Sequence, residues 1–502
     1  MSLSQDFVLK ALLQYNYLPT QRKASEELPP VFTTESFTPE VARKITEATV
    51  SDKRKAAGGF DAVEFRMTRF NGVSRMLSLP HPVAHAHLSL CIHDNWNKLE
   101  YITTNNANSV IRPYEHEDGR VIIMDYEASF EKTKRSLSME FGNRFRAHTD
   151  IATCYPSIYS HSLPWALVGI ETAKLHKPPV HKEDWFNQLD EKVRWNKRNE
   201  TNGIPIGPAT SNIITEAILA RVDESLRERF KFVRFVDDYT AYCESEKDAR
   251  EFIRLLGEEL GKYKLLLNIK KTKISPLPTP VSEGWLGSLA LSLPGDEKIG
   301  AYDAVNFLNL AVELSKEHPD GSVLKYAVKA LLGRGLTPMA EWDVLPYVLM
   351  LSFHHTVLLP TVSSMLENSV ILGVFSYGDQ LKKLLDENTH FHRSDGMCWV
   401  IHYMNKHEVK ISDEQAQAIV KTKDCFAMLM LYLSGGTNHQ SKVIDFAKGL
   451  DVDDLHGLDQ YWLLLYQLFW DGKISNLYDD AAFEILQRNN ISFVKPAEGE
   501  SE

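Results

Sequence analysis

The sequence predicts an α+β chain in which a first part of mixed helices and strands precedes an all-helical second part. Two strand-like runs, 232–236 and 239–242, are rich in β-branched and aromatic residues and flank the adjacent carboxylates Asp237 and Asp238. Between residues 285 and 490, apolar residues recur at helical spacing and strand patterns almost vanish. A hydrophobic content of 43% and a charged content of 25% are typical of a folded globular protein.

The chain divides into four predicted segments: an N-terminal helical segment (1–60), a mixed domain (61–280), an α-helical, solenoid-like domain (285–490) and an acidic tail (491–502). The run Ser275-Pro-Leu-Pro-Thr-Pro280 is typical of a stiff linker and closes the mixed domain. Short polar turns separate the helical stripes of the third segment, but no fixed sequence period is present. We therefore expect helix pairs stacked without a named repeat.

The net charge of −11 is divided unevenly along the chain. Up to residue 280 there are 39 Lys and Arg against 37 Asp and Glu, a balance of +2. From residue 281 onward there are 17 against 30, a balance of −13. The first part can therefore present a basic groove, so the acidic total does not exclude nucleic acid as a partner.

The five cysteines are scattered without CxxC spacing, which argues against a disulfide framework or a four-cysteine zinc site and fits a reducing cytosol. The amino end lacks a basic region followed by an apolar run, so no secretory signal is visible. The most apolar stretch, 344–360, is interrupted by Pro346, His354 and His355. We expect a cytoplasmic protein without a membrane role.

A cluster of potential metal ligands lies in the mixed domain, comprising His81, His85, His87, Cys91 and His93. His81 and His85 are one helical turn apart, which suits a shared zinc ion. The alternative is a helix opened by Pro80 and Pro82 whose polar positions are histidine. We favour the helix, because no second ligand pair with recognisable spacing accompanies these residues.

The carboxylates carry a chemical signal only together with the patterns around them, because an Asp-Asp turn alone more often bonds local backbone. Asp237 and Asp238 are predicted at the tip of a tight hairpin, and Asp150 at the end of another strand. The three would meet if these strands were neighbours in one sheet. Two carboxylates about 4 Å apart repel by roughly 4 kcal/mol at an effective dielectric of 20, so such a cluster attracts cations. Hard ions such as Mg²⁺ prefer carboxylate oxygens, and two such ions are what polymerase-type phosphoryl transfer needs.

Four patterns follow one another along the chain: Asp150-x₄-Tyr155, Pro205-Ile-Gly207 before a helix, Phe235-Val-Asp-Asp238, and Asn268-x₂-Lys271-Thr272. In this order they resemble motifs A, B, C and D of reverse transcriptases. The resemblance covers residues 148–275, and fewer residues match over 60–147, where the fingers would lie. It implies a reverse-transcriptase palm and fingers domain. It does not account for the all-α domain that the helical spacing predicts after it.

The resemblance also implies metal ligands. Asp150 and Asp237 would be the catalytic residues that bridge two Mg²⁺ ions, with Mn²⁺ as a substitute, and Asp238 would assist as a third ligand. Asp150→Asn or Asp237→Asn should then abolish nucleotide incorporation and leave folding intact.

A nucleotide site is implied as well, formed by Tyr155, Arg75, Pro205, Gly207 and Lys271. Tyr155 would lie under the sugar and favour dNTPs by excluding a 2′-hydroxyl; its alternative is a core aromatic. Arg75 resembles a fingers arginine that clamps the triphosphate, and bidentate phosphate contact is arginine chemistry. Lys271 would lie near the leaving phosphates, with a plain surface lysine as the alternative.

One departure concerns the second motif. Template-copying reverse transcriptases usually have Pro-Gln-Gly there, and Ile206 cannot make the polar contacts of that glutamine. The chain is more similar to the abortive-infection (AbiK-like) reverse transcriptases of bacteria. The similar stretches are Tyr159-x-His161-Ser-x-Pro164-Trp165, Gly203-Ile-Pro205 and Arg234-x-Val236-Asp-Asp.

This resemblance implies a bacterial, cytoplasmic DNA polymerase that joins dNTPs without a template, starts from a protein side chain and protects against phage. It further implies homo-oligomers and a single-stranded DNA product that can stay covalently attached. Tyr15 and Tyr17 are among the candidate priming hydroxyls. Two alternatives remain open: a templated, retron-like or group II-like reverse transcriptase, and a helical scaffold that binds a phage or host protein.

Overall fold

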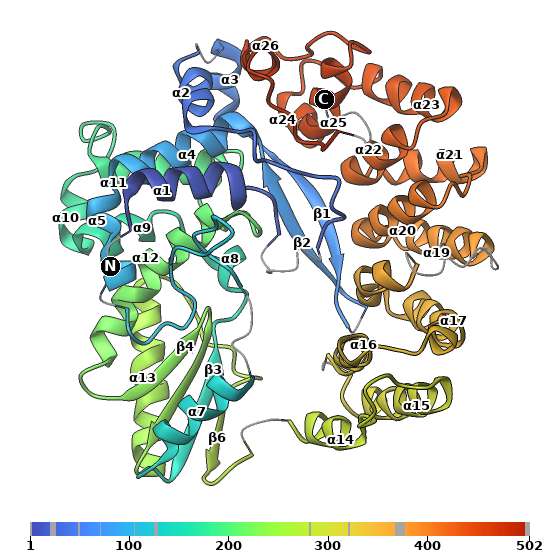
Figure 1. The fold of residues 1–502 in the computed structure, drawn as a ribbon. Coiled ribbons are helices and arrows are strands. Elements are labelled where there is room, and N and C mark those ends of the chain that lie inside the picture. The colour runs from blue at the N-terminus through green and yellow to red at the C-terminus, as the bar shows by residue number, and fades with distance from the viewer. Residues whose placement is uncertain are drawn as a thin grey trace.

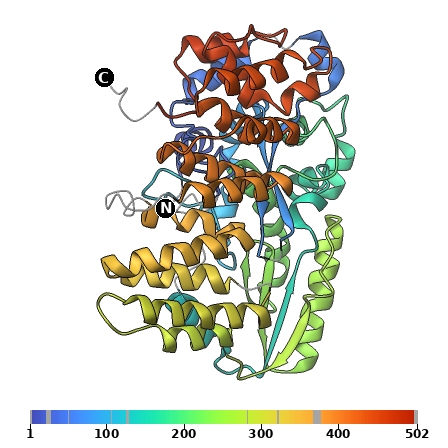
Figure 2. The same ribbon diagram turned by 90° about the vertical axis from the view of Figure 1, so that its right-hand side faces the viewer.

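The computed structural model describes residues 3–20, 27–48, 51–70, 72–104, 106–124, 129–280, 283–319, 322–366 and 377–496. The chain forms a mixed domain around a four-stranded sheet, for which we keep the name palm, and an arc of helices faces it across a long two-stranded hairpin (Figure 1). In the perpendicular view the helices of the arc lie in successive layers from residue 284 towards the carboxyl end (Figure 2). Among the described residues, the elements from residue 284 onward are helices joined by turns, with isolated β-bridges at Ile299 and Val494.

The amino-terminal part contains short helices and the hairpin. Its elements are α1 (Gln5–Lys10), a π-helical turn η1 (Ala11–Tyr15), α2 (Pro39–Glu47), α3 (Asp52–Ala57), β1 (Ala62–Thr68), β2 (Ser74–Pro80), α4 (Pro82–Asp94), α5 (Trp96–Leu99) and α6 (Tyr101–Thr104). Polar residues begin the helices: Ser4, Thr38 and Ser51 each accept a backbone N–H at an amino end. Strands β1 and β2 pair antiparallel, with Met67 opposite Arg75.

The palm sheet has the order β4-β5-β3-β6 and is antiparallel throughout. Its elements are α7 (Ser129–Glu140), β3 (Phe145–Asp150), α8 (Cys154–Ser157), α9 (Ser162–Val168), α10 (Ile170–Leu175), α11 (Trp185–Trp195), α12 (Ala209–Leu226), β4 (Lys231–Phe235), β5 (Asp238–Cys243), α13 (Glu246–Lys262) and β6 (Lys273–Pro276). Alternate strand residues such as Phe232, Tyr239 and Ala147 are buried on one face. Apolar residues of α12 and α13 share their core.

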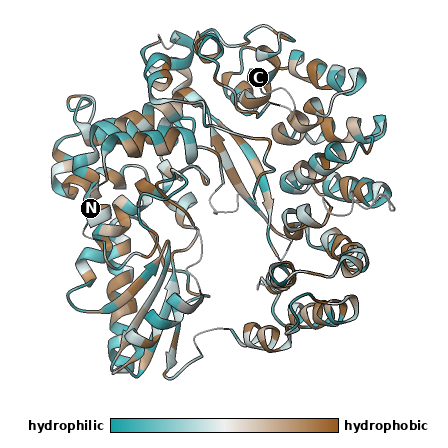
Figure 3. Ribbon diagram, in the orientation of Figure 1, coloured by the Kyte–Doolittle hydropathy of each residue, from teal (hydrophilic) through white to brown (hydrophobic). Residues whose placement is uncertain are grey.

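The helical arc follows the Pro-rich connection. It comprises α14 (Gly284–Ser292), α15 (Ala301–Glu317), α16 (Val323–Arg334), α17 (Pro338–His354), a 3₁₀ turn η2 (Thr356–Thr361), α19 (Gly378–His390), α20 (Ser394–Lys406), α21 (Asp413–Thr422), α22 (Cys425–Leu433), α23 (Thr437–Lys448), α24 (Leu455–Asp459), α25 (Trp462–Trp470) and α26 (Ala482–Arg488). Apolar and polar residues alternate along most of these helices (Figure 3). Among the described residues, no helix combines the length and apolarity that a membrane crossing requires.

Two hydrophobic cores organise these elements. One is shared by the palm and by residues of α1, η1 and α4 to α6, and the other by the amino-terminal segment, the hairpin and the arc. Arg54 and Asp459 join the two ends of the chain through a buried ion pair of 2.6 Å. On strand β1, Thr68 donates its N–H to the Asp395 carboxylate at the start of α20, at 2.8 Å. The arc therefore holds the hairpin in place.

The carboxyl end of the chain returns to the amino-terminal part. Ile491 and Phe493, which the sequence analysis assigned to the acidic tail, are buried in the shared core. Phe32 forms an isolated antiparallel bridge with Val494. Residues 497–502 of the predicted tail lie outside the described residues.

Candidate active site

The three predicted carboxylates lie together at one end of the palm sheet. Asp150 is the last residue of β3 and Asp238 the first of β5, and the two are direct partners across these strands. Asp237 precedes Asp238 in the β4–β5 turn, and its carbonyl accepts the N–H of Ile151 at 3.1 Å. The tip of the hairpin is thus Val236-Asp237, whereas the sequence analysis placed it at Asp237-Asp238. Adjacent strands bring the acids to the same end of the sheet, although among the described residues their oxygens do not all lie within 4.8 Å of one another.

The cluster has more negative charge than positive charge to balance it. The Lys271 ammonium contacts Asp150 Oδ2 at 2.5 Å, and its side chain is 60% exposed. Asp150 Oδ1 is buried and has no hydrogen-bond partner in the described part of the chain. Burial, with a further contribution from Asp238, raises the pKa of Asp237 to about 6. Burial also raises the pKa of Asp238.

These observations fit a divalent-cation site. A buried carboxylate oxygen without a partner costs free energy unless a cation or a donor reaches it. Three oxygen-bearing side chains at one strand end are the hard ligands that Mg²⁺ takes. Asp150, Asp237 and Asp238 would therefore hold the ions.

A buried ionic network on the opposite face positions the Val236-Asp237 turn. Val236 has a φ of 56°, a conformation that strongly disfavours β-branched residues. Its carbonyl accepts a hydrogen bond from Arg234 at 2.8 Å. Arg234 forms ion pairs of 2.7 Å with both Glu216 and Asp223 of helix α12. The network therefore holds a strained turn next to the acids. A strained residue persists only where the surrounding structure fixes its conformation.

Sequence reasoning missed this network. A signal was present: Arg234 occupies an inward-facing strand position, where a charge needs buried partners. Glu216 and Asp223 are seven residues apart, two turns along one face of α12. Burial alone would lower the pKa of Arg234, but the carboxylates of Asp223 and Glu216 outweigh burial and raise it.

Tyr155 lies on α8 with a side chain that is almost fully buried. Its hydroxyl donates to Asn212 Oδ1 of α12 at 2.8 Å. Burial raises its pKa, and the charges of Arg75 and Asp237 act on it in opposite directions. Asn212 was not anticipated from the sequence, because nothing in the local pattern links it to Tyr155.

The loop before α12 connects the hairpin to the palm. The N–H of Ser78 on β2 donates to the Ile206 carbonyl at 2.7 Å, and the N–H of Ile204 donates to the Tyr155 carbonyl at 3.1 Å. Gly207 has a φ of +139°, and a Cβ there would come within 2.7 Å of the Pro19 side chain. Only glycine fits this position. The neighbouring Pro205 lies within the same loop.

Arg75 lies on β2 and faces the same region. Burial lowers its pKa, whereas the charges of Tyr155 and Asp237 act in the opposite direction. The hairpin thus brings a guanidinium within electrostatic reach of the acids. A cation in this position can bind the phosphates of a nucleotide.

The outer face of the sheet, opposite α12 and α13, leads away from the acids. The residues whose side chains lie on this face are Lys231, Val233, Phe235, Thr240, Tyr242, Arg146 and His148. Helix α7 lies over this face: Lys231 donates to the Ser138 carbonyl at 3.1 Å, and the Tyr242 hydroxyl to Ser136 at 3.5 Å (Figure 1). None of the α7 residues from 131 to 140 is buried. The helix covers a basic and aromatic surface without a core of its own.

The histidine-rich helix α4 does not assemble a metal site within the described residues. Burial lowers the pKa of His81, which precedes α4 and stacks on Phe60. His85 Nε2 contacts the Leu12 carbonyl at 2.9 Å, and burial lowers its pKa to about 4. His93 lies against Asp6 and Asp94. These side chains have separate partners, which agrees with the favoured interpretation of packed polar positions.

Residues 109–308 match the family model described as reverse transcriptase (RNA-dependent DNA polymerase). This range contains the three acids, Tyr155, the Gly207 loop and Lys271, and it ends within α15. No curated protein matches the chain in sequence.

Three solved structures are similar to the chain at low identity. Apo telomerase from Candida tropicalis truncated from the C-terminal domain has 15% identity and a TM-score of 0.32, covering 50% of this chain and 57% of its own. Telomerase from Candida albicans in complex with the TWJ fragment of telomeric RNA has 12% identity and a TM-score of 0.31, and the match covers 82% of this chain and 68% of that one. Apo telomerase from Candida tropicalis has 11% identity and a TM-score of 0.32, and the match covers 80% of this chain and 69% of that one. Such values are too low to transfer a function.

Proposed function

We propose the following function for this chain, which carries a reverse-transcriptase domain and is therefore a nucleotidyltransferase of the DNA polymerase type. The chain polymerises dNTPs without a template, starts from one of its own side chains and acts in antiphage abortive infection in the bacterial cytoplasm. The AbiK-like patterns around His161, Gly203 and Arg234 motivate this choice.

Asp150, Asp237 and Asp238 would hold two Mg²⁺ or Mn²⁺ ions, which when bound activate the attacking hydroxyl and neutralise the triphosphate. Arg75 would bind the phosphates from the hairpin, and Lys271 would move from Asp150 to the leaving phosphates once cations replace it. The Tyr155 ring would lie against the sugar.

The observation that carries template independence is helix α7. The inner face of the sheet is filled by α12 and α13, so a nucleic acid ending at the acids must follow the outer face. Helix α7 contacts that face through Lys231 and Tyr242. A duplex would need this surface open, whereas one strand needs only basic and aromatic side chains along its path. The polymer is therefore held as a single strand.

A second observation agrees with the first. The Ile206 side chain packs against both hydrophobic cores and offers no polar group to a template base. Protein priming then supplies the first 3′ hydroxyl at high effective concentration. Tyr17 is unsuited to this role, because it is buried and donates to the Pro80 carbonyl at 2.5 Å. Tyr15 is half-buried.

The helical arc faces the palm where a thumb would stand, and we assign it the contacts between subunits of a homo-oligomer. The charge balance of −13 after residue 280 means that most of its surface repels DNA. The product would then follow the basic outer face of the palm.

One finding favours a second candidate, a templated reverse transcriptase: the matching family model is described as RNA-dependent DNA polymerase. The test is incubation with Mg²⁺ and each labelled dNTP, with and without primer and template, followed by denaturing electrophoresis. We expect label that migrates with the protein, survives boiling in detergent and is released by nuclease. Free labelled DNA that appears strictly with primer and template would establish the second candidate instead.

Cellular protection is tested separately. Bacteria that express the Asp237→Asn variant should lose protection against phage together with polymerisation. A variant that is inactive in vitro and still protects cells would assign the defence to the helical arc as a binding scaffold.

A further inference from the structure

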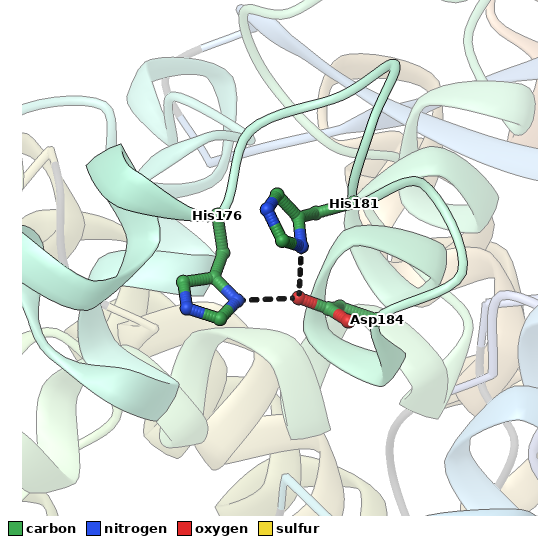
Figure 4. Close-up of side chains that lie close together, drawn as sticks. All are labelled: His176, His181 and Asp184. Carbon is green, nitrogen blue, oxygen red and sulfur yellow. Dashed lines mark hydrogen bonds and ion pairs between the residues drawn. The ribbon is translucent and has the colours of Figure 1, made fainter.

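The loop between α10 and α11 brings two imidazoles and a carboxylate together (Figure 4). His176 follows α10, His181 lies within the loop, and Asp184 precedes α11. His176 Nδ1 lies 3.0 Å from Asp184 Oδ2, and His181 Nδ1 lies 3.6 Å from the same oxygen. The two rings face one another with centroids 4.4 Å apart.

We propose that His176, His181 and Asp184 form a binding site for Zn²⁺ or a similar divalent transition metal, separate from the palm carboxylates. One ring nitrogen of each histidine and a carboxylate oxygen all lie within 4.8 Å of one another. Tetrahedral zinc with ligand distances of about 2.0–2.2 Å requires ligand atoms roughly 3.4 Å apart, which the measured 3.0 and 3.6 Å separations bracket.

The position of Asp184 supports a ligand role. An aspartate at the start of a helix usually accepts a backbone N–H of the first turn, which stabilises the helix. Asp184 makes no such bond with its side chain; the carboxylate is directed to the two imidazoles instead. The Asp184 carboxylate thus does not cap α11, and one of its oxygens contacts a nitrogen of each histidine instead.

A buried amide fixes the loop around these ligands. Asn187, in the first turn of α11, donates its side-chain N–H groups to the carbonyls of His176 at 2.8 Å and His181 at 2.7 Å. The residue is 7% exposed. Both histidine backbones are therefore held from one point, which orders the ligand geometry before a metal binds.

The ligand chemistry selects the kind of metal. Two imidazoles and one carboxylate suit zinc and its neighbours in the first transition row, whereas Mg²⁺ prefers oxygen ligands alone. Three protein ligands leave a fourth position for water or for a group of another molecule. The ligand side chains are between 33% and 45% exposed, so that position is open to solvent.

The test measures metal binding by the full-length protein. Metal-free protein in the Asp237→Asn background, which removes the palm site from the count, is titrated with Co²⁺ and Zn²⁺ by absorption spectroscopy and calorimetry. We expect one ion per chain, Zn²⁺ displacing Co²⁺, and no displacement by millimolar Mg²⁺. His176→Ala and Asp184→Asn should each weaken binding by about 10–100-fold or more.

His161→Ala is the matched control. His161 also contacts a carboxylate, Asp190, at 2.9 Å and is 41% exposed, but among the described residues this pair belongs to no group of three potential ligands. This variant should bind Co²⁺ like the parent, and circular dichroism melting should show all variants folded. Affinity unchanged in His176→Ala and Asp184→Asn, or no Co²⁺ bound by the parent at micromolar concentration, would overturn the proposal.

Discussion

The two faces of the palm sheet carry carboxylates in contrasting states. On the inner face, Glu216 and Asp223 are fully buried around Arg234, which contacts both at 2.7 Å. On the outer face, Asp150 and its neighbours share one lysine, Lys271, whose side chain is 60% exposed. The inner carboxylates also accept hydrogen bonds from Asn106 and Tyr239, whereas Asp150 Oδ1 has no partner among the described residues. Buried charge with its partners in place stabilises one geometry, whereas a carboxylate oxygen without one has affinity left for a ligand. The first cluster therefore shapes the turn, and the second awaits cations.

The largest expected effect comes from the outer cluster. Asp150→Asn or Asp237→Asn should lower dNTP incorporation by roughly 10²–10³-fold or more, because a preorganised charge that binds the metal is lost. The melting temperature should not fall in Asp237→Asn, which removes mutual repulsion, and should change little in Asp150→Asn, which also loses the ion pair with the exposed Lys271, worth about 0–1 kcal/mol. Steady-state incorporation and calorimetry check the two parts. Near-normal incorporation in both variants would place the active site elsewhere.

The inner cluster should respond in the opposite way. Arg234→Met should lower the free energy of unfolding by about 3–5 kcal/mol, because Glu216 and Asp223 would remain buried without a cation. Replacing all three with apolar residues of similar size should recover much of that loss. Urea unfolding measures both variants. An Arg234→Met protein as stable as the parent would show that the network does not hold the turn.

Tyr155 connects the two faces, and two substitutions separate its parts. Tyr155→Phe keeps the ring but leaves Asn212 without its donor, which should cost about 1–3 kcal/mol of stability with nucleotide selectivity unchanged. Tyr155→Ala should raise the ratio of rNTP to dNTP efficiencies. An unaltered ratio in Tyr155→Ala would make the ring a core residue only.

The smallest effect is a pH dependence. The pKa of Asp237 is raised from 3.8 to about 6, so the metal-free fold favours its protonated form. That contribution to stability is complete below pH 3.8 and is lost as pH rises through 6. Mg²⁺ needs the ionised form, so its stabilising effect should be small at pH 5 and larger at pH 7.5. A Mg²⁺-induced change in melting temperature that is independent of pH would contradict this assignment.

The elements near the acids were predictable because their signals are local. The strand-like runs 232–236 and 239–242 correspond to β4 and β5, within one residue at each end. The helical texture after residue 285 likewise needs only the sequence spacing of apolar residues. Such patterns report the face that a segment buries, whatever it packs against.

The remaining features depend on contacts between distant residues. Nothing near Val236 indicates a left-handed residue, because the Arg234 guanidinium that stabilises it is anchored on α12. The Arg54–Asp459 pair joins residues 405 apart, so no local pattern reveals that the arc supports the hairpin. Helix α7 lies over the sheet through single polar contacts, which leave no periodic trace.

The most direct test of the contrast between the two clusters is the number of Mn²⁺ ions bound per chain, measured by electron paramagnetic resonance at pH 7.5. All proteins carry His176→Ala, so that the loop site does not contribute. We predict that Asp150→Asn loses the Mn²⁺ bound by the parent, whereas Glu216→Gln, if folded by circular dichroism, retains it. Equal binding by the parent and Asp150→Asn would contradict the assignment of the outer carboxylates as the metal site.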